Sequence, residues 1–320
     1  MNRPVVAIAD TVFPSLAPAM SALARVEPEV RIARSGSVED ILAVARDADA
    51  ILVTYAKLTE EFLRQLTRCK VIGRFGIGVD NIDVATAAEL GIKVTYVPDY
   101  CIAEVSDHAM TLLLALARKV TLSNGLVQSG RWEMPAVAPL RRIAGQVLGL
   151  VGFGNIARAL APKAKAFGLA VIAHDPYLSN EVFGPFNVDS VSFDELLRRS
   201  DFISLHTPLS PATHALIDAA AFAKMKPGAL ILNTARGPLI DENALLAALD
   251  SGRLGGAALD VVATEPLPKD SSLLGRDNVI LTPHTGFYSV EALEELQTKC
   301  AADVARVLSG EPPVYPLKPL

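Results

Sequence analysis

The feature that most constrains the fold is a glycine-rich turn placed directly after a short apolar run. Residues 147–151 read Val-Leu-Gly-Leu-Val, and Gly152-Phe153-Gly154-Asn155-Ile156-Ala157 follows them. A helical pattern then extends over residues 156–167. A buried strand, a GxGxx[G/A] turn and a helix in this order are typical of a unit that binds dinucleotides. The alternative is an ordinary glycine-rich connection between a strand and a helix.

Each position of this turn has an expected part. Gly152 permits a tight turn, and Gly154 lets the backbone approach a pyrophosphate. Asn155 and Ile156 begin the helix whose N-terminus would hold that anion. Ala157 replaces the third glycine, where the packing of helix on strand requires only a small side chain. We therefore expect Gly152, Gly154, Asn155 and Ile156 to bind a cofactor.

Asp175 indicates which dinucleotide is bound. It lies 23 residues after Gly152, at the end of the next expected strand. A carboxylate there accepts hydrogen bonds from the adenosine ribose hydroxyls and repels a 2′-phosphate. The following residues, Pro176-Tyr177-Leu178, include no Lys or Arg to bind that phosphate. The sequence thus predicts NAD rather than NADP, unless Asp175 is simply an exposed aspartate in a turn.

Short β-branched runs alternate with helical patterns along the whole chain, which is typical of βαβ units on parallel sheets. We expect strands at residues 5–9, 30–33, 50–53, 71–74 and 93–96, and again at 147–151, 169–173, 202–205, 229–233, 256–260 and 279–281. One long helix is expected from residue 102 to about 128, a loop over 130–139 and a closing helix over 290–308.

The expected fold class is α/β, with two open parallel-sheet domains. Residues 1–100 plus 288–320 are expected to form a flavodoxin-like substrate-binding (catalytic) domain. Residues 101–287 are expected to form an inserted Rossmann domain that binds the dinucleotide. The closing helix would then return to the first domain.

Composition argues against several other classes of protein. The chain has 320 residues, a net charge of −5 and no block of Lys or Arg, so nucleic-acid binding is not expected. Its three cysteines are widely spaced, which predicts no disulfide framework and no metal site and suits the cytoplasm. The most apolar long stretch, residues 109–117, is too short to cross a membrane. The N-terminus has no basic segment followed by an apolar one, so no signal peptide is expected.

Arg236, Glu265 and His284 follow the glycine turn in an order that suits chemistry on a bound carbonyl compound. Arg236 comes after the expected strand at 229–233, at its carboxyl end, where open α/β sheets bind ligands. A guanidinium there can hold a carboxylate through two hydrogen bonds and polarise a neighbouring carbonyl. The alternative is a structural arginine paired with Asp241 or Glu242.

His284 is the candidate for proton exchange. Imidazole titrates near neutral pH, and reduction of a ketone by hydride transfer needs a proton for the developing alkoxide. Glu265 could orient the ring. Taken alone, His284 would be a capped or solvated loop residue. The other four histidines lack such a context: we interpret His108 and His214 as structural and His174 and His206 as strand-end residues.

A second glycine-rich turn, residues 73–83, lies in the first expected domain. It reads Gly-Arg-Phe-Gly-Ile-Gly-Val-Asp-Asn-Ile-Asp. Adjacent backbone N–H groups in such a turn can form an anion-binding nest, here for a substrate carboxylate. The alternative is a tight connection between a strand and a helix.

Together these motifs resemble the D-2-hydroxyacid dehydrogenase family over nearly the whole chain. The matching stretches are residues 74–83, 151–157, 206–213, 232–242, 257–266 and 282–286. The resemblance implies that Arg236 anchors the substrate carboxylate and keto oxygen, and that Glu265 and His284 relay the proton. It also implies further contacts: Thr207, Pro208 and Thr213 on the adenosine side, Thr234, Ala235 and Asp260 near the nicotinamide, and Gly76, Ile77 and Gly78 near the substrate.

Within the family, the chain resembles the branch of phosphoglycerate dehydrogenases and C-terminal binding proteins. Residues 164–168, 175–178 and 284–289 look closer to the C-terminal binding proteins, which include NAD(H)-sensing corepressors. Phe287 replaces the Trp of the corepressors, and Cys101 replaces an Asn usual in phosphoglycerate dehydrogenases. Because both positions are expected near the substrate pocket, the sequence does not determine the side chain of the substrate.

The resulting prediction is an NAD-dependent oxidoreductase that interconverts a D-2-hydroxy acid and its 2-keto acid, acting as a homodimer. The alternative is an NAD(H)-responsive binding protein, which would need the dinucleotide site alone. A third and weaker alternative is a phosphite- or formate-oxidising relative on the same scaffold.

Overall fold

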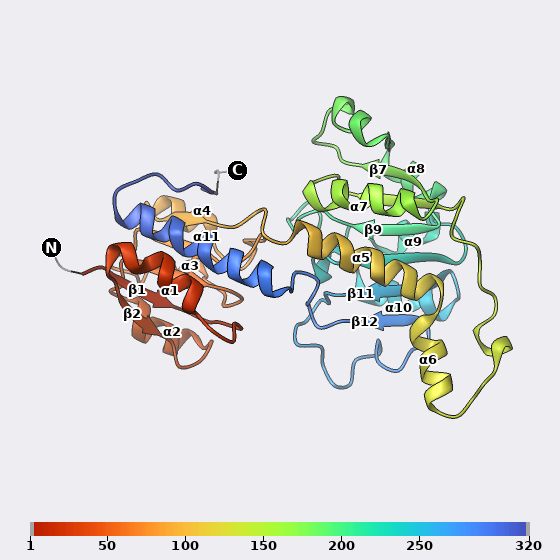
Figure 1. The fold of residues 1–320 in the computed structure, drawn as a ribbon, viewed down its shortest axis with the longest axis horizontal. Helices are drawn as coiled ribbons and strands as arrows, with labels where there is room; N and C mark the ends of the chain where they lie inside the picture. Colours follow the sequence, from red (N-terminus) through yellow and green to blue (C-terminus); the bar gives the residue numbers. More distant parts are fainter. Residues whose placement is uncertain (1–2, 318–320) are drawn as a thin grey trace. The chain divides into compact units, whose positions relative to one another are not determined.

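The computed structural model describes residues 3–317, and the chain forms two compact units (Figure 1). The first unit contains the described chain up to Tyr100 and the chain from Ser289 onward. The second unit is the continuous segment Cys101–Tyr288. The chain therefore leaves the first unit once, builds the second, and returns.

The first unit is built on a five-stranded parallel sheet with the order β2-β1-β3-β4-β5. Its strands are β1 (Val5–Ile8), β2 (Glu29–Ile32), β3 (Ala50–Val53), β4 (Val71–Arg74) and β5 (Lys93–Thr95). All residues of β1, β3 and β4 are buried, as expected for strands covered on both faces. This strand order is the flavodoxin-like one, which confirms the expected fold class.

Short helices cover this sheet, together with one long helix from the end of the chain. They are α1 (Ala17–Leu23), α2 (Val38–Ala45), α3 (Glu60–Leu63), α4 (Val84–Glu89) and α11 (Val290–Leu308), with the 3₁₀ turn η1 (Ala24–Val26). Helix α11 packs on α1 and on β4. At Gly73 a Cβ would lie 2.7 Å from Val304 Cγ2, so this strand position has no room for a side chain beneath α11.

The second unit is built on a seven-stranded sheet with the order β12-β11-β10-β9-β6-β7-β8, and every pairing in it is parallel. The strands are β6 (Val147–Val151), β7 (Ala170–His174), β8 (Asp189–Ser190), β9 (Phe202–Leu205), β10 (Ala229–Asn233), β11 (Leu254–Leu259) and β12 (Val279–Leu281). The chain order reverses at β6, where doubly wound sheets bind dinucleotides. The expected Rossmann fold is confirmed.

Helices cover both faces of this sheet (Figure 1). One face packs against α5 (Ile102–Ala117) and α7 (Asn155–Ala166), and the other against α8 (Phe193–Arg199), α9 (Ala219–Lys224) and α10 (Glu242–Asp250). Two 3₁₀ turns, η3 (Asn180–Val182) and η4 (Gly184–Phe186), lie between β7 and β8, and η5 (Gly237–Leu239) follows β10. Side chains of Asp218 and Asp241 cap α9 and α10 by accepting backbone N–H groups.

The single helix expected from residue 102 to about 128 is wrong. Helix α5 ends at Ala117, and a separate helix α6 (Val120–Gln128) follows at an angle of 60°. Lys119, between them, has a left-handed backbone with φ of 48°, which no helix continues through. The expected loop after α6 contains one 3₁₀ turn, η2 (Met134–Val137). The strand β8 was not expected, because its two residues are exposed and carry no apolar signal.

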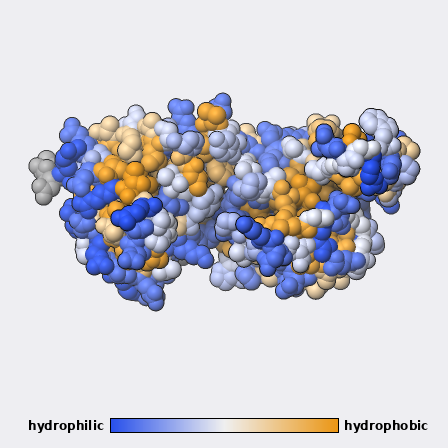
Figure 2. Space-filling view, turned by 90° about the horizontal axis from the view of Figure 1, so that it is seen from below, coloured by the Kyte–Doolittle hydropathy of each residue, from blue (hydrophilic) through white to orange (hydrophobic). Residues whose placement is uncertain are grey.

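Helix α6 differs from the other long helices because none of its residues is buried. Val120 and Val127 are 53% and 47% exposed, and Trp132 and Met134, in and beside the turn that follows, are 88% and 82% exposed. Apolar patches between hydrophilic areas are also visible on the face drawn in Figure 2. Within residues 3–317, no helix alone has the length and apolarity to span a membrane; α5 and α6 meet the criterion only as a bent pair, and α5 is largely buried.

Candidate active site

The parallel sheet of the second unit gathers the predicted residues at one edge. Because the carboxyl ends of parallel strands meet at the same edge, residues that follow different strands lie on one side of the sheet. The residues directly after the strands, or within three positions of them, are Gly152 (β6), Asp175 (β7), Thr207 (β9), Arg236 (β10), Asp260 (β11) and His284 (β12).

The glycine turn has the backbone geometry that dinucleotide binding requires. Gly152 has φ of +87°, and a Cβ there would lie 2.8 Å from the backbone oxygen of His206. Gly154 is the N-cap of α7, and a Cβ there would meet no atom within 4 Å. The turn is therefore closed toward the sheet and open at the helix N-terminus, where Asn155 and Ile156 begin α7. Ala157 is fully buried, as its packing role requires.

Asp175 connects the end of β7 to the glycine turn. Its Oδ2 accepts a hydrogen bond from the Phe153 N–H at 2.9 Å, and its Oδ1 accepts from the Tyr177 N–H at 3.1 Å. Asp175 is thus more than an isolated aspartate in a turn, because it holds the glycine turn itself. Its contact with a ribose stays a prediction.

The loop after β9 is closed by Thr213. The Thr213 hydroxyl donates to the Pro208 carbonyl at 2.7 Å and accepts from the Ser210 N–H at 2.8 Å. Thr207 lies against the glycine turn, because a Cβ on Gly152 would be 3.0 Å from the Thr207 nitrogen. Thr207 therefore borders the glycine turn, and Thr213 and Pro208 belong to the loop that follows it. The adenosine-side role of the three residues stays a prediction.

The loop after β10 is organised by Asn233, which is fully buried. Its Nδ2 donates to the Arg236 carbonyl at 2.7 Å, and its Oδ1 accepts from the Ala235 N–H at 3.0 Å. The Arg236 Nη1 donates to the Ala235 carbonyl at 2.7 Å. The hydroxyl of Thr234 is buried without a hydrogen-bond partner among the described residues. An ordered water or the edge of a bound ligand would satisfy such a hydroxyl.

Gly237 brings the Arg236 loop against the loop that carries Glu265. A Cβ on Gly237 would lie 2.0 Å from both the carbonyl carbon and the oxygen of Val262, and 2.5 Å from the nitrogen of Ala263. No side chain fits there. The two loops therefore touch through their backbones, which keeps the segments of Arg236 and Glu265 adjacent.

Glu265 and His284 form the predicted pair. The Oε2 of Glu265 is 2.7 Å from Nδ1 of His284, and its Oε1 accepts the Val262 N–H at 3.2 Å. Both side chains are partly exposed. The ring of Phe287 meets the imidazole edge-on, with centroids 6.0 Å apart. His284 has φ of 55°, an unusual backbone conformation for a residue other than glycine.

Asp260 anchors the loop of His284. Its buried carboxylate accepts hydrogen bonds from the Thr282 hydroxyl at 2.6 Å and from the N–H groups of Thr285 and Gly286 at 2.9 and 2.8 Å. Its carbonyl accepts the His284 N–H at 2.8 Å. Burial alone would raise the pKa of Asp260, but these bonds, with one from His108, lower it below its usual value. Asp260 is thus held as a carboxylate.

The turn predicted to bind a substrate carboxylate lies in the first unit, after β4. Gly76 has φ of +149°, and a Cβ there would overlap the guanidinium of the buried Arg74. The Gly76 N–H donates to the Arg74 carbonyl at 2.9 Å, so that amide is already engaged within the turn. The substrate role of Gly76, Ile77 and Gly78 stays a prediction.

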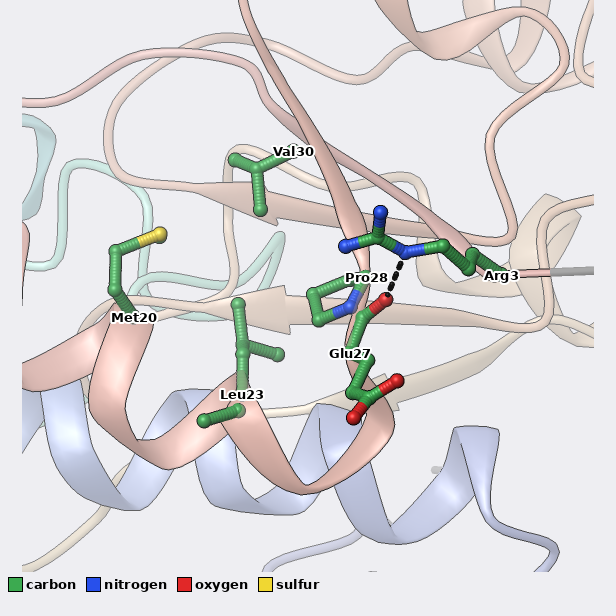
Figure 3. A pocket seen from close by; sticks show the side chains of 7 residues that line it. Arg3, Met20, Leu23, Glu27, Pro28 and Val30 are labelled. Atoms are coloured by element: carbon green, nitrogen blue, oxygen red, sulfur yellow. Dashed lines mark hydrogen bonds between the residues drawn. The ribbon is translucent and has the colours of Figure 1, made fainter.

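A large surface depression, of about 590 Å³, lies elsewhere (Figure 3). It is in the first unit, beside α1 and β2, and is lined by Met20, Leu23, Pro28 and Val30 among others. The Nε of Arg3 donates to the Glu27 carbonyl at its margin, at 2.9 Å. None of the predicted site residues lines it.

Among residues 3–317, no group of three or more His, Cys, Asp and Glu side chains is arranged to hold a metal ion.

Comparison with known proteins identifies the family. Residues 110–286 match the model of the D-isomer specific 2-hydroxyacid dehydrogenase, NAD binding domain. The chain belongs to the D-isomer specific 2-hydroxyacid dehydrogenase family. The resemblance inferred from the motifs is thereby confirmed. So is the predicted cofactor, since the NAD-binding domain of this dehydrogenase-family chain spans the glycine turn and His284.

Individual relatives agree with this assignment. A D-3-phosphoglycerate dehydrogenase of Methanocaldococcus jannaschii is 41% identical over 285 residues, covering 88% of this chain and 54% of that protein. A solved structure from Thermus thermophilus is 34% identical, with a TM-score of 0.89, covering 98% of this chain and 100% of that one. A D-lactate dehydrogenase of Aquifex aeolicus, solved with NAD and lactic acid, is 28% identical, with a TM-score of 0.85 and 96% of both chains covered.

These relatives confirm the phosphoglycerate dehydrogenase-like side of the resemblance. This dehydrogenase-family chain spans about half the length of the curated relatives it matches, 54% for the Methanocaldococcus protein. The closer likeness to C-terminal binding proteins stays a prediction.

One residue of the site was missed: His108, interpreted from sequence as structural, contacts Thr282 and Asp260. No local motif marks it, because its partners are more than 150 residues away.

Proposed function

We propose that this chain is an NAD-dependent oxidoreductase that interconverts a D-2-hydroxy acid and its 2-keto acid. The observation that carries the proposal is the Glu265–His284 pair, 2.7 Å apart, at the sheet edge that also bears the glycine turn. An acid–base pair beside a dinucleotide site suits a reaction that moves a proton and a hydride together. A protein that only senses NAD(H) would have no use for it.

The residues present suit NAD. Gly154 leaves the N-terminus of α7 open, and Asp175 lies at the end of β7. The buried Thr234 hydroxyl has no hydrogen-bond partner among the described residues. These positions would hold the pyrophosphate, the ribose and the nicotinamide side, respectively. When bound, the cofactor exchanges a hydride at C4 of its nicotinamide. The protein supplies orientation and the proton.

His284 is assigned the proton. With Nδ1 directed at Glu265, the ring presents Nε2 for exchange with the substrate oxygen: it donates a proton to the developing alkoxide in reduction and accepts it in oxidation. We assign to Arg236 the binding of the substrate carboxylate, and its guanidinium also helps to polarise the keto oxygen. Its backbone is held by Asn233 and by the contact at Gly237, so the guanidinium starts from a rigid base.

For the substrate, we propose small 2-keto acids, with 3-phosphohydroxypyruvate first because curated relatives are phosphoglycerate dehydrogenases. The test is oxidation of NADH with a panel of phosphorylated, acidic, small aliphatic and aromatic 2-keto acids. Arg236→Gln should lower kcat/KM by roughly 100-fold or more, as loss of a charged anchor does. The matched control is Arg199→Gln, which removes a surface arginine paired with Glu195 and should change nothing.

Other outcomes of the same assay would point elsewhere. Tight NADH binding with no turnover across the panel would favour the NAD(H)-responsive binding protein. NAD⁺ reduction with formate or phosphite, and none with 2-hydroxy acids, would favour the third alternative. Either result would overturn the dehydrogenase proposal.

We further propose that the chain is a cytoplasmic homodimer. The unburied helix α6 and the turn after it expose Val120, Val127, Trp132 and Met134, and we call this surface the apolar arm; exposed apolar side chains of this kind are typical of subunit contacts. The free thiols of Cys69 and Cys300 suit a reducing compartment.

A further inference from the structure

His108 lies on α5, a helix that carries none of the predicted catalytic residues. Its Nε2 is 3.0 Å from the Thr282 hydroxyl and 3.3 Å from Oδ1 of Asp260. Most of the ring is buried, and Asp260 is almost completely so. A histidine facing a buried carboxylate is an expensive arrangement unless both groups are satisfied, so this contact is specific rather than incidental.

The hydrogens in this cluster can be assigned. The Thr282 hydroxyl has one proton, and the 2.6 Å contact with the Asp260 carboxylate requires that Thr282 donates it there. The Thr282 oxygen must then accept from His108, whose Nε2 therefore carries a hydrogen. The chain of donors runs from His108 through Thr282 to Asp260.

The same carboxylate holds the backbone on the far side of His284. Its two oxygens accept the N–H groups of Thr285 and Gly286. The packing around Gly286 leaves no room for a side chain, because a Cβ there would lie 2.8 Å from Asp260 Oδ2 and 3.2 Å from Cδ2 of His108. His108, Asp260 and residues 282–286 thus pack as one body.

His284 sits inside that body with a strained backbone. A φ of 55° in a residue other than glycine persists only where its surroundings over-determine it. Here the His284 N–H is bound by the Asp260 carbonyl, and the next two N–H groups by the Asp260 carboxylate. A rotation of the Asp260 carboxylate would release the N–H groups of Thr285 and Gly286, and the backbone that follows His284 would lose its anchor, so the imidazole would move away from its working position.

We propose that His108 is a positioning residue for proton transfer at His284, acting through Thr282 and Asp260. This inference rests on the proposed dehydrogenase function. His108 fixes the rotamer of the Asp260 carboxylate from the helix side, and that carboxylate fixes the loop. The effect belongs to the chemical step, because the described contacts of His108 lead through Thr282 and Asp260 to the loop that carries His284.

The test compares His108→Leu with His108→Gln in the full chain. Leu fills the space but donates nothing, whereas the Gln amide can place an N–H close to the position of Nε2. For the Leu variant we expect a kcat about 10-fold or more below wild type, with the KM for the 2-keto acid nearly unchanged. For the Gln variant we expect kcat to recover to within about 3-fold of wild type. Residues that hydrogen-bond to metal-bound histidines show effects of this size. Asp107→Asn, on the same helix but facing Lys163, is the control and should retain full activity. If the Leu variant does not fold, His108→Asn, whose amide is too short to reach, replaces it.

A second measurement separates this inference from the proposed function. The imidazole nitrogen resonances of His284, in protein labelled with ¹⁵N-histidine, should shift in the Leu variant and return in the Gln variant. If wild type turns over no 2-keto acid but these shifts occur, the dehydrogenase proposal fails and the positioning of His284 by His108 stands. If wild type is active, and the Leu variant keeps both its kcat and its His284 resonances, the positioning role is refuted.

Discussion

Oε2 of Glu265 lies 2.7 Å from Nδ1 of His284, and the backbone of His284 occupies the left-handed region with φ of 55°. The orientation of the imidazole is thus set twice, by a hydrogen bond at the ring and by a strained backbone held by Asp260. Glu265 is itself oriented, since its second oxygen accepts the Val262 N–H at 3.2 Å. Such double constraint is what a proton donor needs to meet a substrate oxygen in one geometry.

Replacing the carboxylate of Glu265 should slow the chemical step. Glu265→Gln keeps the shape and one hydrogen bond but removes the charge beside the imidazole, so kcat should fall by roughly 10- to 100-fold, within the range of general acid–base catalysis. The KM for NADH should stay within about 2-fold, as the glycine turn is untouched. Steady-state kinetics measure both values. Glu242→Gln, at the start of α10, is the control, and equal kcat values for the two variants would contradict the relay.

Gly237 should tolerate no side chain. A Cβ there would sit 2.0 Å from the Val262 carbonyl, so Gly237→Ala must push the Arg236 loop away from the Glu265 loop. We expect kcat/KM to fall by roughly 100-fold and the free energy of unfolding to fall by about 1–3 kcal/mol, as for other overpacked sites. Kinetics and denaturant unfolding measure these effects. Gly184→Ala, where a Cβ meets no atom within 4 Å, should leave both quantities unchanged. A fully active Gly237→Ala variant would show that the contact does not organise the site.

Asp175 should control the choice of cofactor. Asp175→Ala removes the acceptor for ribose hydroxyls and the repulsion of a 2′-phosphate, so kcat/KM for NADH should drop at least about 10-fold while that for NADPH falls less or rises. It also removes the bond to the Phe153 N–H, which adds to the loss with both cofactors. The ratio of the two kcat/KM values is therefore the decisive quantity. Asp189→Ala, on the exposed β8, serves as the control. An unchanged ratio would refute the assignment.

Much of the fold could be predicted from short-range patterns. Strands such as β6 and β9 are short, mostly apolar runs bounded by turn residues, and α11 has a capping serine, Ser289, and a regular apolar stripe. Such signals are local, so their boundaries follow from the sequence. The break between α5 and α6 could not be found in this way. Lys119 is a good helix former, and its left-handed backbone arises where helix α6, which buries no residue, turns away from the packed end of α5.

The candidate site shows the same difference between local signals, which the sequence contains, and long-range contacts, which it does not. The residue types, their order and the resemblance to the family pointed to Arg236, Glu265 and His284. The contacts that organise them join segments far apart in the chain: Gly237 with Val262, and His108 with Asp260. Neither pair has a sequence signature, since a glycine in a loop and a histidine on an apolar helix have many common structural uses. Only the packed loops reveal what they do.

The stability of the protein should depend on pH through His206. Burial lowers the pKa of His206 from 6.5 to about 4, and the ring is 2.9 Å from the Ser204 hydroxyl, which can donate to a neutral nitrogen. In the unfolded chain this histidine binds a proton below about pH 6.5, and in the folded chain only below about pH 4. Unfolding therefore takes up a proton between these values, and stability falls as the pH is lowered through this window, by up to roughly 3 kcal/mol. Denaturant unfolding at several pH values should show this slope, and His206→Asn should lose it. A wild-type slope in that variant would assign the effect to other groups.

The apolar arm around α6 should associate with a second copy of the chain. Trp132 is the only tryptophan and is 88% exposed in the single chain, so burial in a dimer should shift its fluorescence to shorter wavelength. Sedimentation of the wild type should give a dimer at micromolar concentration, and Val127→Asp, which places a charge on α6, should give a monomer with red-shifted emission. Val38→Asp makes the same change at a 53% exposed valine of the first unit and should remain a dimer with unchanged emission. A wild type that sediments as a monomer, with the emission of a fully hydrated indole, would refute the proposed dimer.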